Sequence, residues 1–144
     1  MFCKKISSVF LRSFLLSTFL FYSRFVAAQD QLLGNYQTPD KDGKVEFIKR
    51  GNRYFGKLTQ SAHPKKDVHN PNPAMHTTNL VGAEFIKDLV YKDKNSWEDG
   101  AIYDSRSGKT YSCDIVLLEN GDIKIRGYLG FPLLGQSVIF YRIK

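Results

Sequence analysis

Cysteine is scarce in this chain, whose 144 residues include two, Cys3 and Cys113. Cys3 precedes the apolar run near the amino terminus, where no lipid-attachment site of a lipoprotein would lie. Once the amino-terminal segment is removed, one thiol remains and an internal disulfide is excluded, so a hydrophobic core must stabilise the fold. Cys113 stands in the strand-like run T-Y-S-C-D-I-V-L-L, which favours a buried, inert thiol over a reactive one.

Sequence motifs for catalysis and metal binding are also missing. The chain has no G-x-S-x-G and no phosphate-binding glycine loop. Glu98 and Asp99 are adjacent, and neighbours on an extended chain point to opposite faces, so they cannot flank one substrate bond. His63, His69 and His76 are spaced too widely for a compact zinc pattern. We therefore predict no catalytic residue, no metal and no cofactor, and an enzyme ranks third among the functional hypotheses.

The amino terminus, by contrast, has a recognisable export pattern. Lys4 and Lys5 precede an apolar run over residues 13–22, and Val26-Ala27-Ala28 is a small-residue cleavage sequence. This pattern predicts a secretory signal peptide over residues 1–28, removed to leave a single domain over residues 29–144. An uncleaved anchor is the alternative, although the run is shorter than the ~18 residues that span a membrane. We expect a periplasmic protein, or alternatively a secreted one, without a stable membrane span after cleavage.

The basic charge of the chain belongs largely to that leader. The formal net charge is +7, and four basic residues (Lys4, Lys5, Arg12, Arg24) leave with the signal peptide, so +3 remains. A nucleic-acid partner requires a dense basic surface. The sequence therefore gives a nucleic-acid partner little support.

The remaining chain has the pattern of short antiparallel strands separated by turns. Gly51-Asn52 and Asn120-Gly121 each separate two extended runs, which predicts two hairpins. About eight strands in one domain predict an all-β fold, either an up-and-down barrel or a sandwich. The predicted strands are Leu32–Thr38, Lys44–Arg50, Arg53–Gln60, Phe85–Tyr91, Gly100–Asp104, Lys109–Glu119, Asp122–Gly130 and Gln136–Ile143.

The Asn120-Gly121 hairpin allows a prediction of register. A two-residue turn pairs Leu118 with Ile123 and Val116 with Ile125, which places these four apolar side chains on the core face. Glu119 with Asp122, Leu117 with Lys124, and Ile115 with Arg126 then share the other face. A slip by one residue would exchange the two faces.

A polar segment over residues 61–79 interrupts the strand pattern and contains Pro64, Pro71 and Pro73. Proline removes donors from a strand ladder, so we predict a long loop between the third and fourth strands. Loops of this length in compact domains are often functional, and a flexible surface excursion is the alternative.

Aromatic and charged residues form the candidate ligand site. Aromatic rings at a barrel mouth with a few converging charges would make a ligand pocket. The competing interpretation is structural, with the rings filling the barrel ends and Asp104 pairing with a nearby cation. The candidate residues are Tyr54, Trp97, Tyr103, Asp104, Lys109, Tyr111, Arg126, Tyr128 and Arg142.

The segment W-E-D-G-A-I-Y-D-S-R-S-G-K-T-Y-S, followed by G-D-I-K-I-R-G-Y-L-G and a terminal Y-R, resembles an exported bacterial family, domain of unknown function 2147. G-N-Y at residues 34–36, Y-F-G-K at 54–57 and D-V-H-N-P-N-P from Asp67 add to the resemblance, which spans the mature chain. Four positions depart from the family pattern: Tyr36, His76, Ser105 and Phe140.

The resemblance implies a calycin-type barrel with the architecture of lipocalins, and it implies no established activity. A barrel of eight strands has room for its own side chains or one small ligand. Our first hypothesis is therefore an envelope protein that binds a small, lipid-like or amphipathic ligand. The alternative is a solid-core module whose surface or 61–79 loop contacts an envelope protein.

Overall fold

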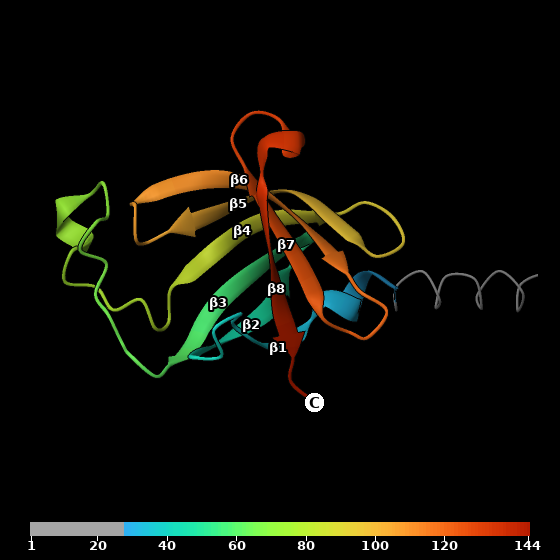
Figure 1. The fold of residues 1–144 in the computed structure, drawn as a ribbon, viewed down its shortest axis with the longest axis horizontal. Helices are drawn as coiled ribbons and strands as arrows, with labels where there is room; N and C mark the ends of the chain where they lie inside the picture. Colours follow the sequence, from blue (N-terminus) through green and yellow to red (C-terminus); the bar gives the residue numbers. More distant parts are fainter. Residues whose placement is uncertain (1–27) are drawn as a thin grey trace, which may run out of the picture. The chain divides into compact units, whose positions relative to one another are not determined.

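The computed structural model describes residues 28–144, and these form a closed antiparallel barrel whose eight strands follow one another in chain order (Figure 1). The predicted signal peptide, residues 1–28, lies outside the described residues except for Ala28. The strands are β1 (Gly34–Gln37), β2 (Gly43–Arg50), β3 (Arg53–Ser61), β4 (Glu84–Tyr91), β5 (Ser96–Asp104), β6 (Lys109–Leu117), β7 (Ile123–Tyr128) and β8 (Gln136–Arg142). Three short 3-10 helices are η1 (Asp30–Leu32), η2 (Pro73–Met75) and η3 (Pro132–Leu134).

The barrel confirms the predicted fold class and the predicted number of strands. Each strand pairs with its neighbour in sequence, and β8 closes the barrel by pairing with β1 through Tyr36↔Arg142 and Gln37↔Tyr141. The Gly51-Asn52 turn is the predicted two-residue connection, since Arg50 pairs directly with Arg53. A turn over residues 105–108 joins the predicted strands that end at Asp104 and begin at Lys109, because Asp104 pairs with Lys109 and Gly108 has a φ of +69°.

The predicted register of the β6–β7 hairpin is wrong by one residue. Ile115 pairs with Ile125 and Leu117 with Ile123, so Ile115 faces the core and Val116 is exposed. The turn contains an extra residue: the Gly121 N–H donates to the Leu118 carbonyl, and the Leu118 N–H donates to the Asp122 carbonyl. Gly121 has a φ of +92°, as in a three-residue turn with a glycine bulge. The added residue exchanges the two faces of β6, whereas Ile123 and Ile125 of β7 face the core as predicted.

Two bulges interrupt the regular pairing of β4 and β5. Asp88 in β4 and Asp99 in β5 have left-handed φ values of +61° and +60°, which aspartate tolerates better than branched residues. The strand register shifts between Trp97 and Gly100. A Cβ at Gly100 would lie 2.7 Å from the Leu89 side chain, so only glycine fits there without a shift. β5 begins at Ser96 and not at the predicted Gly100. The bulge interrupts the alternation of inward and outward residues, so the sequence pattern did not reveal the first part of the strand.

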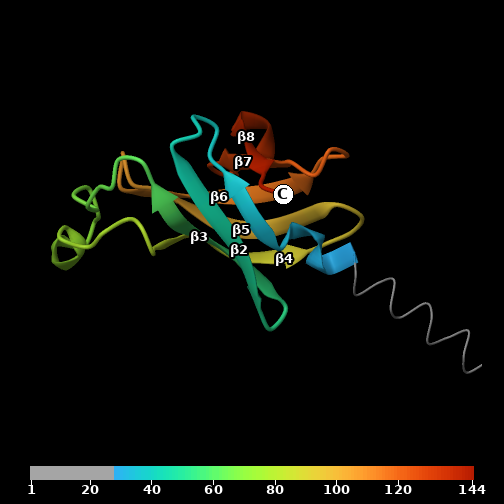
Figure 2. The same ribbon diagram turned by 90° about the horizontal axis from the view of Figure 1, so that it is seen from below.

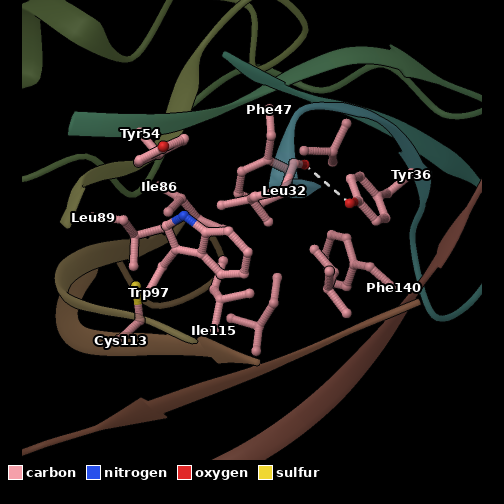
Figure 3. Close-up of a cluster of buried hydrophobic side chains, with 13 residues drawn as sticks. Leu32, Tyr36, Phe47, Tyr54, Ile86, Leu89, Trp97, Cys113, Ile115 and Phe140 are labelled. Carbon is pink, nitrogen blue, oxygen red and sulfur yellow. Dashed lines mark hydrogen bonds between the residues drawn. The ribbon is translucent and has the colours of Figure 1, made fainter. Parts of the chain in front are cut away.

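The barrel interior is filled by thirteen buried side chains that point toward one another (Figure 3). The Tyr36 ring meets Phe47 edge to face at 5.5 Å, and the Tyr36 hydroxyl donates to the Leu32 carbonyl. Trp97 packs between Tyr54 and Tyr91, with ring centroids 6.1 and 5.5 Å apart. These contacts close the core and hold the strands in one arrangement.

Candidate functional site

The nine residues predicted for a ligand site occupy four separate regions. Tyr54 and Trp97 are fully buried in the core. Trp97 Nε1 is buried with no hydrogen-bond partner among residues 28–144. Both rings pack against other side chains, so they support the fold and do not line an open site.

Tyr103, Asp104, Lys109 and Tyr111 lie at the end of the barrel formed by the β5–β6 hairpin. Asp104 is turned into its own loop, where it accepts hydrogen bonds from Arg106 and Ser107. Burial raises the pKa of the Asp104 carboxyl, but these hydrogen bonds outweigh burial and hold the pKa below its usual value. Asp104 thus makes a self-contained turn, in line with the structural interpretation of this residue.

Arg126 and Tyr128 lie on the outside of β7, away from Tyr103. The Arg126 guanidinium donates to the Pro132 carbonyl and, at 3.3 Å, to Ser137 Oγ. The Tyr128 hydroxyl donates to Asp114 Oδ1 over a long 3.4 Å. The Arg126 contacts support the β7–β8 connection, and the Tyr128 contact joins β7 to β6.

Arg142 joins the first and last strands of the barrel. Its side chain donates to the Gly121 carbonyl (2.9 Å), the Leu33 carbonyl (3.2 Å) and the Tyr36 hydroxyl, and it stacks on the Tyr36 ring. The terminal Y-R of the sequence therefore has a structural role at the barrel seam. The structure does not bring the nine predicted residues together.

The loop over residues 62–83 is ordered by its own hydrogen bonds and lies beside the tip of the β5–β6 hairpin (Figures 1 and 2). Lys66 and Asn79 form an isolated bridge, and the Asn72 side chain caps η2. The His76 Nε2 N–H donates to the Asn70 carbonyl oxygen at 2.8 Å. The predicted long loop is present, and its polar residues shape it internally.

Asp67 anchors this loop to the barrel. It is 7% exposed, and its two carboxylate oxygens accept hydrogen bonds from the Tyr103 hydroxyl at 2.6 Å and from the Asn70 amide at 2.7 Å. Burial and this hydrogen bond raise the pKa of Tyr103 to about 12, so the phenol keeps its proton and is the donor. The His69 carbonyl packs so closely on Gly108 that a Cβ there would lie 2.0 Å from it.

A pocket of about 880 Å³ lies between this loop and the outer face of the sheet. Its wall comes from β3 to β6, whose residues there alternate with core residues such as Ile86 and Cys113 and so point outward. The wall residues are Lys57, Glu84, Lys87, Ala101, Tyr103 and Thr110. The loop side includes Asp67, Asn70, Met75, Thr78 and Val81. Tyr103 is the one predicted site residue that lines this pocket.

The acidic residues of the pocket already have partners. Arg50 donates to both Glu84 oxygens, at 2.6 and 2.9 Å. This hydrogen bonding holds the pKa of Glu84 below its usual value, and the charges of Lys57 and Lys87 act in the same direction. Within the described part of the chain, neither lysine side chain forms a hydrogen bond or an ion pair. The pocket therefore presents two available cations.

Among residues 28–144, no group of three or more His, Cys, Asp and Glu side chains is placed to hold a metal ion. Cys113 is buried as predicted, and burial raises the pKa of its thiol to about 12. None of the helices over residues 28–144 has the length and apolar character that crossing a membrane requires.

Sequence reasoning missed Lys57 and Lys87 as site residues, and it named Asp67 only as the start of a run in the family resemblance. Lys57 ends the run Y-F-G-K, which added to the family resemblance but pointed to no ligand, and Lys87 belongs to none of the quoted motifs. Both occupy ordinary polar positions on the outside of a strand. The available signal was the run D-V-H-N-P-N-P, which starts at the residue that anchors the loop.

Comparison with known proteins gave two matches. Residues 34–142 match the model of a family described as "Uncharacterized protein conserved in bacteria (DUF2147)". A solved structure described as "Protein HP1028 from the human pathogen Helicobacter pylori belongs to the lipocalin family" is similar, with a TM-score of 0.73 and 27% sequence identity. The match covers 78% of this chain and 83% of that one. No curated protein sequence matched.

Proposed function

The chain belongs to the DUF2147 family, and from this premise we propose that it is an exported protein that binds a small or amphipathic ligand in the cell envelope. The amino-terminal pattern of Lys4, Lys5, the apolar run over residues 13–22 and Val26-Ala27-Ala28 supports export to the periplasm, with secretion as the alternative. The similarity to a protein described as a lipocalin supports ligand binding.

The pocket beneath the 62–83 loop is the observation that carries this proposal. Its volume of about 880 Å³ falls in the range of small-molecule sites, roughly 300–1,000 Å³. It combines apolar residues such as Met75, Val81 and Ala101 with a few polar groups, the usual composition of a ligand site. The ligand therefore binds on the outside of the barrel, because the interior is occupied by core side chains.

Mass spectrometry of small molecules that copurify with the protein tests this proposal. Thr110→Trp places a large ring in the pocket from an exposed position on β6, and Val116→Trp is the matched control on the same face of the same strand. We expect the copurifying molecule with wild type and Val116→Trp and its loss with Thr110→Trp. The same molecule at equal occupancy in all three proteins would contradict a site in this pocket.

An exposed apolar tip favours a second function, as a module that contacts an envelope protein. In the β7–β8 connection, Leu129, Phe131, Leu133 and Leu134 are 66%, 73%, 91% and 79% exposed. Contiguous exposed apolar residues of this kind are typical of interaction surfaces. Cross-linking in envelope preparations should give one stoichiometric partner that is lost in Leu133→Gln but kept when residues 65–75 are deleted. Identical cross-links in wild type and Leu133→Gln would exclude this function.

We propose no enzymatic activity. Asp104, the acid at the family signature turn, is held by hydrogen bonds from Arg106 and Ser107 within its own turn. No group of three or more His, Cys, Asp and Glu side chains among residues 28–144 is placed to hold a metal ion beside it. Turnover of a substrate that Asp104→Ala abolishes without unfolding the protein would contradict this proposal.

A further inference from the structure

We infer that the pocket beneath the 62–83 loop binds an anionic amphipath, with its oxyanion head at Lys57 and Lys87 and its alkyl chain along the apolar residues of the pocket. This inference rests on the proposed function and adds the chemical class of the ligand. The starting observation is that two strands place a lysine each on the same pocket wall, Lys57 from β3 and Lys87 from β4.

The two lysines flank one carboxylate that is already neutralised. Lys57 is paired in register with Glu84, and Lys87 lies three residues further along β4. Both lysines act on the charge of Glu84, but Arg50 from outside the pocket takes both of its oxygens. Arg50 and Glu84 cancel, so the two lysine charges remain on this part of the wall.

The other acid of the pocket is equally unavailable to the lysines. Asp67 is 7% exposed and gives its oxygens to Tyr103 and Asn70, at 2.6 and 2.7 Å. An anion in the pocket can thus approach the lysines without displacing an existing ion pair. A cationic ligand would instead meet two like charges, which disfavours it.

The remaining surface suits an apolar chain. Phe85 on the wall packs partly against the core, and Met75 and Val81 face it from the loop side. Ala101 has the smallest side chain on the wall, so it leaves space for an alkyl chain beside these apolar residues. A lysine ammonium is a compact positive charge that binds carboxylate, sulfate or phosphate alike. The ligand class is therefore defined by an oxyanion head on an alkyl chain.

Calorimetric titration with defined probes tests the inference. The probes are dodecanoate and dodecyl phosphate as amphipathic anions, acetate and inorganic phosphate as heads without a chain, and dodecyltrimethylammonium as a cation with the same chain. We expect the two amphipathic anions to bind and the other three to bind far more weakly. Preference between dodecanoate and dodecyl phosphate identifies the head group.

Charge variants make the test specific. Lys57→Gln combined with Lys87→Gln should raise the Kd of dodecanoate by about tenfold. Lys124→Gln, an exposed outward lysine on β7, is the matched control and should leave the Kd unchanged. Circular dichroism should show the same thermal transition for all variants, because each lysine is a surface residue.

The possible results separate this inference from the proposed function. If dodecanoate and dodecyltrimethylammonium bind equally and the lysine variants change nothing, while Thr110→Trp still blocks both, the anionic class is wrong and the pocket still binds ligands. If no probe binds, or Thr110→Trp has no effect on binding, the proposed function is wrong as well.

Discussion

The two faces of the sheet formed by β3 to β6 differ in what covers them. On the inner face, Tyr54, Ile86, Leu89, Trp97 and Cys113 are fully buried against the other strands (Figure 3). On the outer face, the same strands carry the wall of a pocket of about 880 Å³ beneath the 62–83 loop. The inner face therefore stabilises the fold, and the outer face carries the pocket that we propose as the ligand site.

This difference shows that a lipocalin-like architecture does not by itself place a ligand inside the barrel. Tyr36, Phe47 and Trp97 are large rings, and packed interiors have few voids larger than a water molecule. A long loop that docks on the outside through Asp67 forms a separate pocket with the outer face of the sheet. Substitutions on the two faces should therefore affect different properties.

The largest expected effect is on the inner face. Trp97→Ala removes the ring that packs between Tyr54 and Tyr91, and large-to-small core changes of this kind cost about 3–5 kcal/mol. Urea unfolding followed by far-UV circular dichroism measures the loss of stability. Tryptophan fluorescence cannot serve as the probe, because Trp97 is the one tryptophan of the chain. Trp97→Phe should cost less, since it keeps a ring and removes an N–H that has no partner within residues 28–144. Equal costs for the two variants would argue against this packing.

The seam of the barrel should show the next largest effect. Arg142→Met removes hydrogen bonds to the carbonyls of Gly121 and Leu33 and to the Tyr36 hydroxyl, at a cost of about 2–3 kcal/mol. Arg106→Met is the control, because that side chain is 91% exposed. Dodecanoate affinity below the unfolding transition should be unchanged in both variants. A selective loss of dodecanoate affinity in Arg142→Met would contradict the claim that residues outside the pocket affect stability and not binding.

A smaller effect is expected where the loop docks. Tyr103→Phe removes the 2.6 Å hydrogen bond to Asp67 and should destabilise the loop by about 1–2 kcal/mol. Hydrogen exchange of the 65–80 amides measures this opening, and dodecanoate binding should weaken with it. The matched control is Tyr128→Phe, whose hydroxyl makes a long 3.4 Å contact on the same side of the sheet. If both variants expose the loop equally, the Asp67 anchor is not what holds it.

Glu84→Gln should change stability least, and its effect should depend on pH. Hydrogen bonding by Arg50 lowers the pKa of Glu84 in the folded state, so its contribution is present above the unfolded value, about 4.3, and is lost as pH falls through the folded value. Wild type should therefore lose more stability than the variant on acidification below about pH 4. Thermal melting across pH measures the difference. Parallel curves would show that the ion pair is energetically neutral.

The strand pattern could be predicted from the sequence because short β-branched runs and Asn-Gly or Gly-Asn pairs are local signals. Prediction failed where one residue was added to a regular pattern. Gly121 at +92° adds a residue to the β6–β7 turn and exchanges the faces of Val116 and Ile115. Asp99 at +60° breaks the alternation of β5, so its first half did not look like a strand.

The candidate site was less accessible to sequence reasoning, for a physical reason. Aromatic residues are equally suited to a core and to a binding site, and burial decided the role of Tyr54 and Trp97. Strand pairing and a bulge bring Lys57 and Lys87 to the wall of one pocket, and no local sequence pattern encodes that placement. Tyr103 was predicted, but its partner Asp67 lies 36 residues away.

The most direct test of the account is to map the backbone amide chemical shifts of the protein during titration with dodecanoate. A ligand on the outer face should shift the amides of Lys87, Ala101 and Thr110 and of the loop around Asp67. Amides of the far side of the core, such as Val45 and Ile125, should stay in place. Saturable shifts centred on Val45 and Ile125, with Lys87 and Thr110 unchanged, would place the ligand inside the barrel and contradict the account.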